Sequence, residues 1–153
     1  MQCNLIFSGI TAVCAVVGSS ALIIAVRQFK FSTWLKAQEI FVDSDFKEAR
    51  GVVLLHYWER NKEWTKDDTK KRELVCARMD ELARLVPYIK EKTVLETWDD
   101  PMGKCWEVLR DFVIQERTKT KWDVKWKAFE VLGGKALARV KDRERRYEET
   151  QKT

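Results

Sequence analysis

The stretch that decides the organisation of this chain runs from Leu5 to Val26 and reads Leu-Ile-Phe-Ser-Gly-Ile-Thr-Ala-Val-Cys-Ala-Val-Val-Gly-Ser-Ser-Ala-Leu-Ile-Ile-Ala-Val. It contains no charged residue, no proline, no asparagine and no glutamine. A helix of this length, rising about 1.5 Å per residue, is roughly 33 Å long, and the hydrocarbon core of a bilayer is about 30 Å thick. The stretch therefore predicts one transmembrane helix.

A cleaved secretory signal peptide is the alternative interpretation of this stretch. Such a signal has a positive segment, an apolar core of about 7–15 residues and a small-residue cleavage site. Here the apolar run is longer, and only the α-amino group supplies positive charge before it. Cleavage at the small residues 18–21 would also leave the apolar residues 22–26 at the new N-terminus. We therefore expect an uncleaved anchor.

The charges that flank the stretch predict its orientation. Basic residues follow it, no acidic residue occurs before Glu39, and no charged side chain precedes it. The positive-inside rule then places the N-terminus outside and the rest of the chain in the cytoplasm, at the plasma (inner) membrane. Aromatic rings beside the basic residues are typical of the headgroup layer. The predicted membrane-interface residues are Arg27, Phe29, Lys30, Phe31, Trp34 and Lys36.

Small side chains recur along the stretch at helical spacing. The predicted helix–helix face consists of Ser8, Ala12, Ala15 and Ser19. Such a stripe lets two membrane helices approach closely. Small residues are also common in membrane helices in general, so both a self-associating and a monomeric anchor stay open.

The remainder of the chain has the composition of a helical domain. The 153 residues include 29 basic and 24 acidic ones, for a net charge of +5, and the acids are interleaved with the bases. A nucleic-acid-binding protein concentrates its positive charge on one face, so we do not expect nucleic acid as a partner. Six glycines and two prolines favour helices over a turn-rich β fold. We expect an all-α chain in which one transmembrane helix precedes an antiparallel bundle of four to five helices.

Local signals predict where the domains and helices begin and end. We expect a transmembrane anchor at 1–28, a juxtamembrane segment at 29–43, a helical bundle domain at 44–141 and a charged C-terminal tail at 142–153. Ser44 is the expected N-cap of the first bundle helix. Thr65 and Asp68 have the spacing of a capping box for the second.

Two prolines and a glycine pair predict further boundaries. Pro87 is expected to stop a helix or start a short one, with a short helix and a loop over 88–98. Asp100 at N-cap and Pro101 in the first turn predict the next start. The last helix is expected from about 122 to 149, with a core seam at Trp122, Trp126, Phe129, Gly133, Ala136 and Val140. The pair at 133–134 suggests a kink or a close approach by a neighbour.

The chain offers few groups for catalysis. His56 is the only histidine and lies in a helical pattern beside aromatic residues, which is typical of a helix surface or core edge. The pairs Asp67-Asp68 and Asp99-Asp100 stand where helices are expected to begin, and N-capping accounts for acids there. No phosphate-binding loop, dinucleotide fingerprint, EF-hand loop or zinc-protease motif occurs. We therefore expect no enzyme and no cofactor.

Cysteines and tryptophans carry two further expectations. The four cysteines, Cys3, Cys14, Cys76 and Cys105, include no CxxC pair and fit a reducing compartment; Cys76 and Cys105 become disulfide candidates if the domain faces outward. Seven tryptophans with many bases could form a stacking platform for single-stranded nucleic acid, but Trp106, Trp122 and Trp126 fit a helical core. Trp58, Trp64 and Trp98 lie near expected helix ends and are candidate anchors for a protein partner.

Several of these patterns resemble a bacterial family of small, often membrane-anchored helical proteins classed as a domain of unknown function. The resembling positions, between about 30 and 138, are Phe46–Arg50, Trp64–Asp68, the helix from Val75 to Val86, Trp106, Arg117, Trp126, Phe129 and Leu132. The resemblance implies an apolar helix followed by a helical domain, with no catalytic residues to carry over.

The sequence thus predicts a single-pass membrane protein whose helical bundle acts as an interaction or scaffold module. Its partners would be the lipid bilayer and either another protein or a second copy of the chain. The alternative is a small membrane effector, for example in phage defence, that oligomerises through its transmembrane helix.

Overall fold

The structure is a computed structural model that describes residues 2–60, 63–120 and 125–151, with side chains from residue 19 onwards. These residues form five helices and no strand: α1 (Gln2–Val42), α2 (Ser44–Trp58), α3 (Lys66–Ile89), α4 (Glu91–Thr120) and α5 (Lys127–Gln151). The prediction of an all-α fold with a helical bundle is confirmed.

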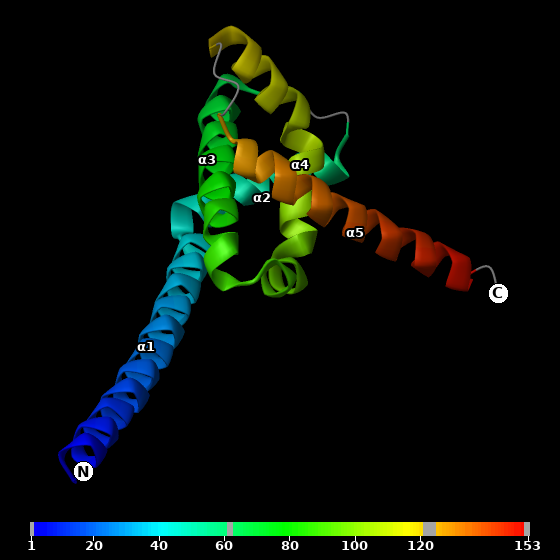
Figure 1. Ribbon diagram of the computed structural model, residues 1–153. Helices are drawn as coiled ribbons and strands as arrows, with labels where there is room; N and C mark the ends of the chain where they lie inside the picture. The colour runs from blue at the N-terminus through cyan, green and yellow to red at the C-terminus, as the bar shows by residue number, and fades with distance from the viewer. Residues whose placement is uncertain (1, 61–62, 121–124, 152–153) are drawn as a thin grey trace.

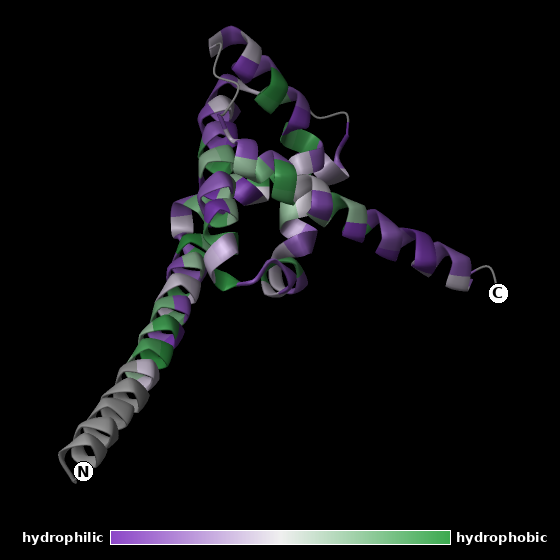
Figure 2. Cartoon of the chain, viewed as in Figure 1, coloured by the Kyte–Doolittle hydropathy of each residue, from purple (hydrophilic) through white to green (hydrophobic). Residues whose placement is uncertain are grey.

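The bundle has two helices that extend beyond it. In Figure 1, α3 descends and α4 returns upward beside it, while α5 lies across the pair and α2 lies behind them. The first part of α1 and the last part of α5 project from this body in different directions. Figure 2 shows that the projecting part of α5 is hydrophilic, whereas the coloured part of α1 outside the bundle carries hydrophobic residues.

The predicted transmembrane stretch lies in the projecting part of α1. The side chains of residues 5–18 fall outside the described residues, so only 19–26 of the stretch can be placed. Within the described ranges, no helix is both long enough and apolar enough to span a membrane.

The last quarter of α1 belongs to the bundle. Thr33, Ala37 and Ile40 are buried. Of residues 29–43, expected as a juxtamembrane segment, residues 29–42 therefore continue the helix of the stretch and contribute to the core from Thr33 onwards, and Asp43 caps the next helix.

Arg50 fixes the turn from α1 into α2. Its guanidinium lies over the rings of Phe41, at 4.0 Å, and of Phe46, at 5.2 Å, and donates to the Phe41 carbonyl oxygen at 3.5 Å. The N-cap of α2 is Asp43, whose Oδ1 accepts from the Phe46 amide at 2.8 Å, so the prediction of Ser44 was one residue off. Cation–π contact and capping together give the two helices a defined joint.

The core follows the apolar seams of the sequence. Its largest fully buried side chains come from four helices: Phe46 and Val53 (α2), Met79 and Leu82 (α3), Met102 and Leu109 (α4), Phe129 and Val140 (α5). The predicted seam is confirmed as buried from residue 126 onwards, but the helix begins at Lys127, after Trp126, rather than near 122; Trp122 lies outside the described residues. The capping box of Thr65 and Asp68 is also confirmed, with both reciprocal hydrogen bonds present.

The helix end predicted at Pro87 falls two residues later, at Ile89, whereas the loop and the helix start predicted before Pro101 are wrong. Pro87 lies inside α3, α4 begins at Glu91, and Pro101 lies inside α4 with Asp100 before it rather than at a helix start. A proline inside a helix removes one backbone hydrogen bond and costs about 3 kcal/mol. Here the free energy gained by burying the neighbouring side chains offsets this cost, since Trp98 and Met102 are 3% and 0% exposed. Figure 1 shows that α4 changes direction along its length.

Two glycines set the contact between α4 and α5. A Cβ on Gly103 would lie 2.7 Å from the Leu137 nitrogen and 2.9 Å from the Ala136 carbonyl carbon. A Cβ on Gly133 would lie 2.8 Å from the Trp106 Cβ. The close approach predicted for the glycine pair is therefore confirmed at Gly133, and Gly103 is its unpredicted counterpart on α4.

Candidate functional site

The part of α1 that leaves the bundle is the most unusual surface of the molecule. Every side chain from residue 19 to residue 32 is exposed. The exposed fraction is 66% for Leu22, 54% for Ile23 and 56% for Ile24. Apolar side chains that stay exposed on all sides of a helix forgo about 1.5–3 kcal/mol each relative to burial. Such a surface is typical of a segment that another apolar phase or partner covers.

The predicted membrane-interface residues divide into two groups. Arg27, Phe29, Lys30 and Phe31 are exposed at the base of the projecting segment. Trp34 and Lys36 instead have partners within the protein. Trp34 stacks on Trp98 with ring centroids 5.1 Å apart, and the Lys36 Nζ lies 3.8 Å from a carboxylate oxygen of Glu81.

Tyr88 at the end of α3 adjoins the exposed group. Its ring meets the Phe29 ring edge-on, with centroids 5.7 Å apart, and 51% of Tyr88 is exposed. The backbone at Phe29 is anchored by two hydroxyls, because Ser32 and Thr33 both donate to its carbonyl oxygen, at 2.9 and 2.8 Å. Tyr88 was not among the residues predicted from the sequence; its one sequence signal was an aromatic residue with lysines two and four positions later.

The predicted helix–helix face is only partly visible. The side chains of Ser8, Ala12 and Ala15 lie outside the described residues, and Ser19 is exposed. A self-associating face on α1 therefore stays a prediction.

A column of stacked rings and cations runs through the upper part of the bundle. His56 stacks on Trp64 with centroids 3.5 Å apart, and Arg72 lies 4.6 Å from the centroids of both Trp64 and Phe112. Phe112 stacks on Trp126, over which the Lys125 ammonium lies at 4.2 Å. Cation–π contacts stabilise such stacks, so the column joins α2, α3 and α4 to the segment before α5.

His56 also lines a polar pocket of about 300 Å³, together with Tyr57, Arg60, Trp64, Glu107 and Val108. The Tyr57 hydroxyl donates to Glu144 at 3.2 Å. Burial first, and then the nearby charges of Glu144 and Glu107, raise the pKa of Tyr57 to about 12. Tyr57 therefore stays protonated at neutral pH, and the pocket gains no general base from it.

Trp58 is the exposed tryptophan among the three candidate partner anchors. It is 67% exposed, and the Lys104 ammonium lies 4.5 Å from its ring centroid. Trp98 is buried and Trp64 is half-buried in the column. Trp106 and Trp126 are 6% and 8% exposed, which confirms them as core residues.

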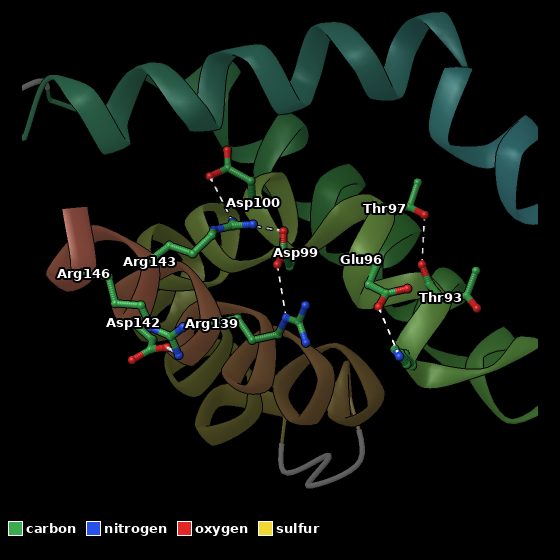
Figure 3. A network of polar contacts seen from close by, with 10 residues as sticks. Thr93, Glu96, Thr97, Asp99, Asp100, Arg139, Asp142, Arg143 and Arg146 are labelled. Carbon is green, nitrogen blue, oxygen red and sulfur yellow. Dashed lines mark hydrogen bonds and ion pairs between the residues drawn. The ribbon is translucent and has the colours of Figure 1, made fainter. Parts of the chain in front are cut away.

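The carboxylate pair at 99–100 holds α4 to α5 (Figure 3). Asp99 is only 4% exposed; its Oδ2 accepts from the Arg139 Nε at 3.2 Å and its Oδ1 from the Arg143 Nη2 at 3.1 Å. Asp100 pairs with Lys104 at 2.9 Å and lies 3.8 Å from Arg143. The prediction that these acids cap a helix is wrong, because they lie inside α4 and their partners are basic side chains.

Of the other pair, Asp68 is a capping residue. Its Oδ2 accepts from the Thr65 amide at 2.9 Å and from the Thr65 hydroxyl at 2.7 Å, and these bonds lower the pKa of Asp68. Asp67 lies in the first turn of α3, where an acid is favourable beside the positive helix end.

The two cysteines of the bundle are free thiols and both are buried. Burial raises the pKa of Cys76, and it raises that of Cys105 to about 12. In the parts of the chain that the structure describes, no three histidine, cysteine, aspartate or glutamate side chains come together as metal ligands.

Comparison with protein-family models, with curated proteins and with solved structures finds no match to this chain. The resemblance to a bacterial family of membrane-anchored helical proteins stays a prediction.

Proposed function

We propose that this protein is a single-pass membrane-anchored interaction module, with residues 5–26 of α1 in the bilayer and the helical bundle held in the cytoplasm. One observation carries the proposal. α1 is continuous from Gln2 to Val42, yet its side chains are exposed over 19–32 and buried in the bundle from Thr33. A helix of this kind supports an anchor because lipid would cover the apolar side chains that the bundle leaves bare.

The basic and aromatic residues at the base of the exposed segment support the same reading. Arg27 and Lys30 would lie among lipid phosphates, and Phe29 and Phe31 at the depth preferred by aromatic rings. These four residues are the proposed membrane interface. Trp34 and Lys36 would act mainly inside the bundle, since both have protein partners.

The face that carries Trp58 is the proposed contact for a protein partner. Large aromatic side chains that are exposed beside charged groups dominate the free energy of many protein interfaces. Trp58 is the most exposed tryptophan of the described residues, and it adjoins the pocket lined by Tyr57 and Arg60.

The anchor is tested by placing arginine in the stretch of the full chain. Val16→Arg and Ile23→Arg together should move the protein from the carbonate-washed membrane fraction to the supernatant, because an arginine at the helix centre, as at Val16, costs about 2.5–3.5 kcal/mol of insertion free energy and Ile23→Arg adds a smaller cost nearer the helix end. Ile114→Arg is the matched control, because Ile114 is as exposed as Ile23 but lies on α4. If the double variant stays in the membrane like the control, the proposal is wrong.

An oligomerising effector is the second candidate, and the sequence stripe Ser8, Ala12, Ala15 and Ser19 favours it. Ala12→Leu with Ala15→Leu would block close helix approach without lowering hydropathy. Toxicity on induced expression that this variant abolishes would support the effector. A harmless wild-type protein that remains monomeric in detergent would support the scaffold.

A further inference from the structure

The turn between α3 and α4 lies beside the point where α1 leaves the bundle. α3 ends at Ile89, α4 begins at Glu91, and Lys90 connects them in an extended conformation. The edge-on contact of the Phe29 and Tyr88 rings joins this turn to α1. Figure 1 agrees, since the turn is at the same end of the bundle as the projecting part of α1.

The position of Tyr88 along α1 corresponds to the headgroup layer of a bilayer. Phe29 follows Val26, the last residue of the apolar stretch, by about 4.5 Å along the helix. The interfacial layer on each side of the hydrocarbon core is roughly 5–7 Å thick. A ring packed against Phe29 therefore lies inside that layer when the stretch spans the core.

The attachment of α1 keeps the turn at this depth. α1 has no break between the stretch and the buried residues Thr33 and Ala37, and Arg50 fixes its far end against α2. The bundle consequently follows the tilt of α1 as one body.

The charges of the turn suit an anionic surface. Lys90 is exposed, and Lys92 is exposed and forms a surface pair with Glu96 at 3.7 Å. The acid between the two lysines, Glu91, is turned to another partner, since Lys135 bonds both of its oxygens at 2.8 Å. The exposed end of the turn thus presents an aromatic ring and two ammonium groups, the combination that binds phospholipid headgroups.

We propose that the α3–α4 turn is a second membrane contact, in which Tyr88, Lys90 and Lys92 bind anionic lipid headgroups beside the α1 anchor. This inference rests on the proposed anchor. Its consequence is that the end of the bundle that carries the turn faces the bilayer.

Photo-cross-linking of the full chain tests the contact. The amino acid p-benzoylphenylalanine replaces Leu22, Tyr88 or Tyr147 one at a time, and each protein is reconstituted into phosphatidylcholine vesicles that contain a minority of phosphatidylglycerol. Tyr147 is the matched control, since it is an exposed tyrosine, at 68%, near the end of α5. We expect phospholipid adducts at positions 22 and 88 and no adducts at position 147.

The outcomes separate the two proposals. Adducts at position 22 with none at position 88 overturn the second contact and leave the anchor intact. If adducts form at neither position, the proposed anchor itself is overturned. Equal labelling at positions 88 and 147 also overturns the inference, because exposure alone would then account for it.

The charge of the turn has its own test. Lys90→Gln with Lys92→Gln should lower the adduct yield at position 88 by about fivefold for each lysine lost, and only when phosphatidylglycerol is present. Lys66→Gln with Lys70→Gln, at the opposite end of α3, is the control. A yield that the first pair leaves unchanged contradicts the role of the lysines.

Discussion

Gly103 shows how a single hydrogen atom in place of a side chain decides the packing of two helices. It sits where α4 meets the α5 backbone, and the three atoms nearest to a Cβ at this position are backbone atoms of Ala136 and Leu137, which cannot move aside as a flexible side chain could. Gly51, in contrast, is exposed on α2 with no atom within 4 Å of its would-be Cβ. Both are helical glycines, so their substitutions separate packing from helix propensity.

Gly103→Ala should lower the free energy of unfolding by about 1–3 kcal/mol, because overpacking outweighs the better helix propensity of alanine. Gly51→Ala should raise it by about 0.5–1 kcal/mol. Urea unfolding of the full chain in detergent, followed by circular dichroism, measures both. Effects of the same sign would contradict the close α4–α5 approach.

Buried thiols allow a second residue-scale prediction. Cys76 and Cys105 should resist N-ethylmaleimide at pH 7–8 in the folded protein and react after unfolding, because burial raises the pKa of both thiols and the thiolate is the reactive form. Mass spectrometry of the separate peptides checks this. Since the folded pKa values lie above the unfolded ones, stability is full below about pH 9 and declines as the pH rises beyond it. Rapid labelling of folded protein would argue against the burial.

At the scale of elements, α5 depends on α3 for its start. Trp126 precedes α5 with a φ of 56°, and the buried Oδ1 of Asp80 accepts from the Phe129 amide at 2.9 Å. Asp80 thus caps α5 from another helix and places negative charge at its positive end. Arg84 on α3 neutralises the same carboxylate at 2.7 Å.

Asp80→Ala should therefore lower the free energy of unfolding by about 1–3 kcal/mol, because a buried amide loses its acceptor. Asp80→Asn should cost less, since its side-chain oxygen still accepts. The control is Asp67→Ala, an exposed first-turn acid on α3 whose loss should cost no more than about 0.5–1 kcal/mol. Equal losses in Asp80→Ala and Asp67→Ala would show that Asp80 caps nothing.

Among the ion pairs of Figure 3, those of Asp99 with Arg139 and Arg143 join α4 to α5 through one buried carboxylate. Asp99→Asn should lower the free energy of unfolding by about 1–3 kcal/mol, because two arginines lose a charged acceptor. The neighbouring Asp100→Asn should change it by less than about 0.5–1 kcal/mol, because that side chain is 52% exposed. Chemical denaturation of the two variants compares them directly, and a larger effect at Asp100 would contradict the network.

At the scale of the whole molecule, α1 connects the proposed bilayer segment to the bundle without a hinge. The predicted orientation can therefore be tested by the protease accessibility of tags at the two termini. In intact cells, protease added outside should remove a tag at the N-terminus and spare a tag at the C-terminus, as the positive-inside rule requires. Digestion of the C-terminal tag would show that the topology is the reverse of the predicted one. Cys76 and Cys105 would then lie in an oxidising compartment.

Sequence patterns correctly predicted the features that depend on residues close together in the sequence. The seam through Phe129, Ala136 and Val140 and the capping box of Thr65 and Asp68 involve residues within a few turns of one another, so spacing alone reveals them. The same reasoning failed at Pro101 and Asp99. There, packing and ion pairs from a helix about forty residues away outweigh the local preference for a helix start.

The sequence by itself determined that the chain is helical, which faces of its helices are buried, and that an apolar stretch precedes the bundle. Only the tertiary structure decided that α1 runs unbroken into the core, that Asp80 caps α5, and that Tyr88 lies beside Phe29. Helix periodicity depends on residues that are close together in the sequence. The contacts of Asp80 and Tyr88 instead join residues more than thirty positions apart, and the path of α1 into the core depends on where the other helices lie in space. Their free energy comes from burial and pairing that exist only once the helices have packed.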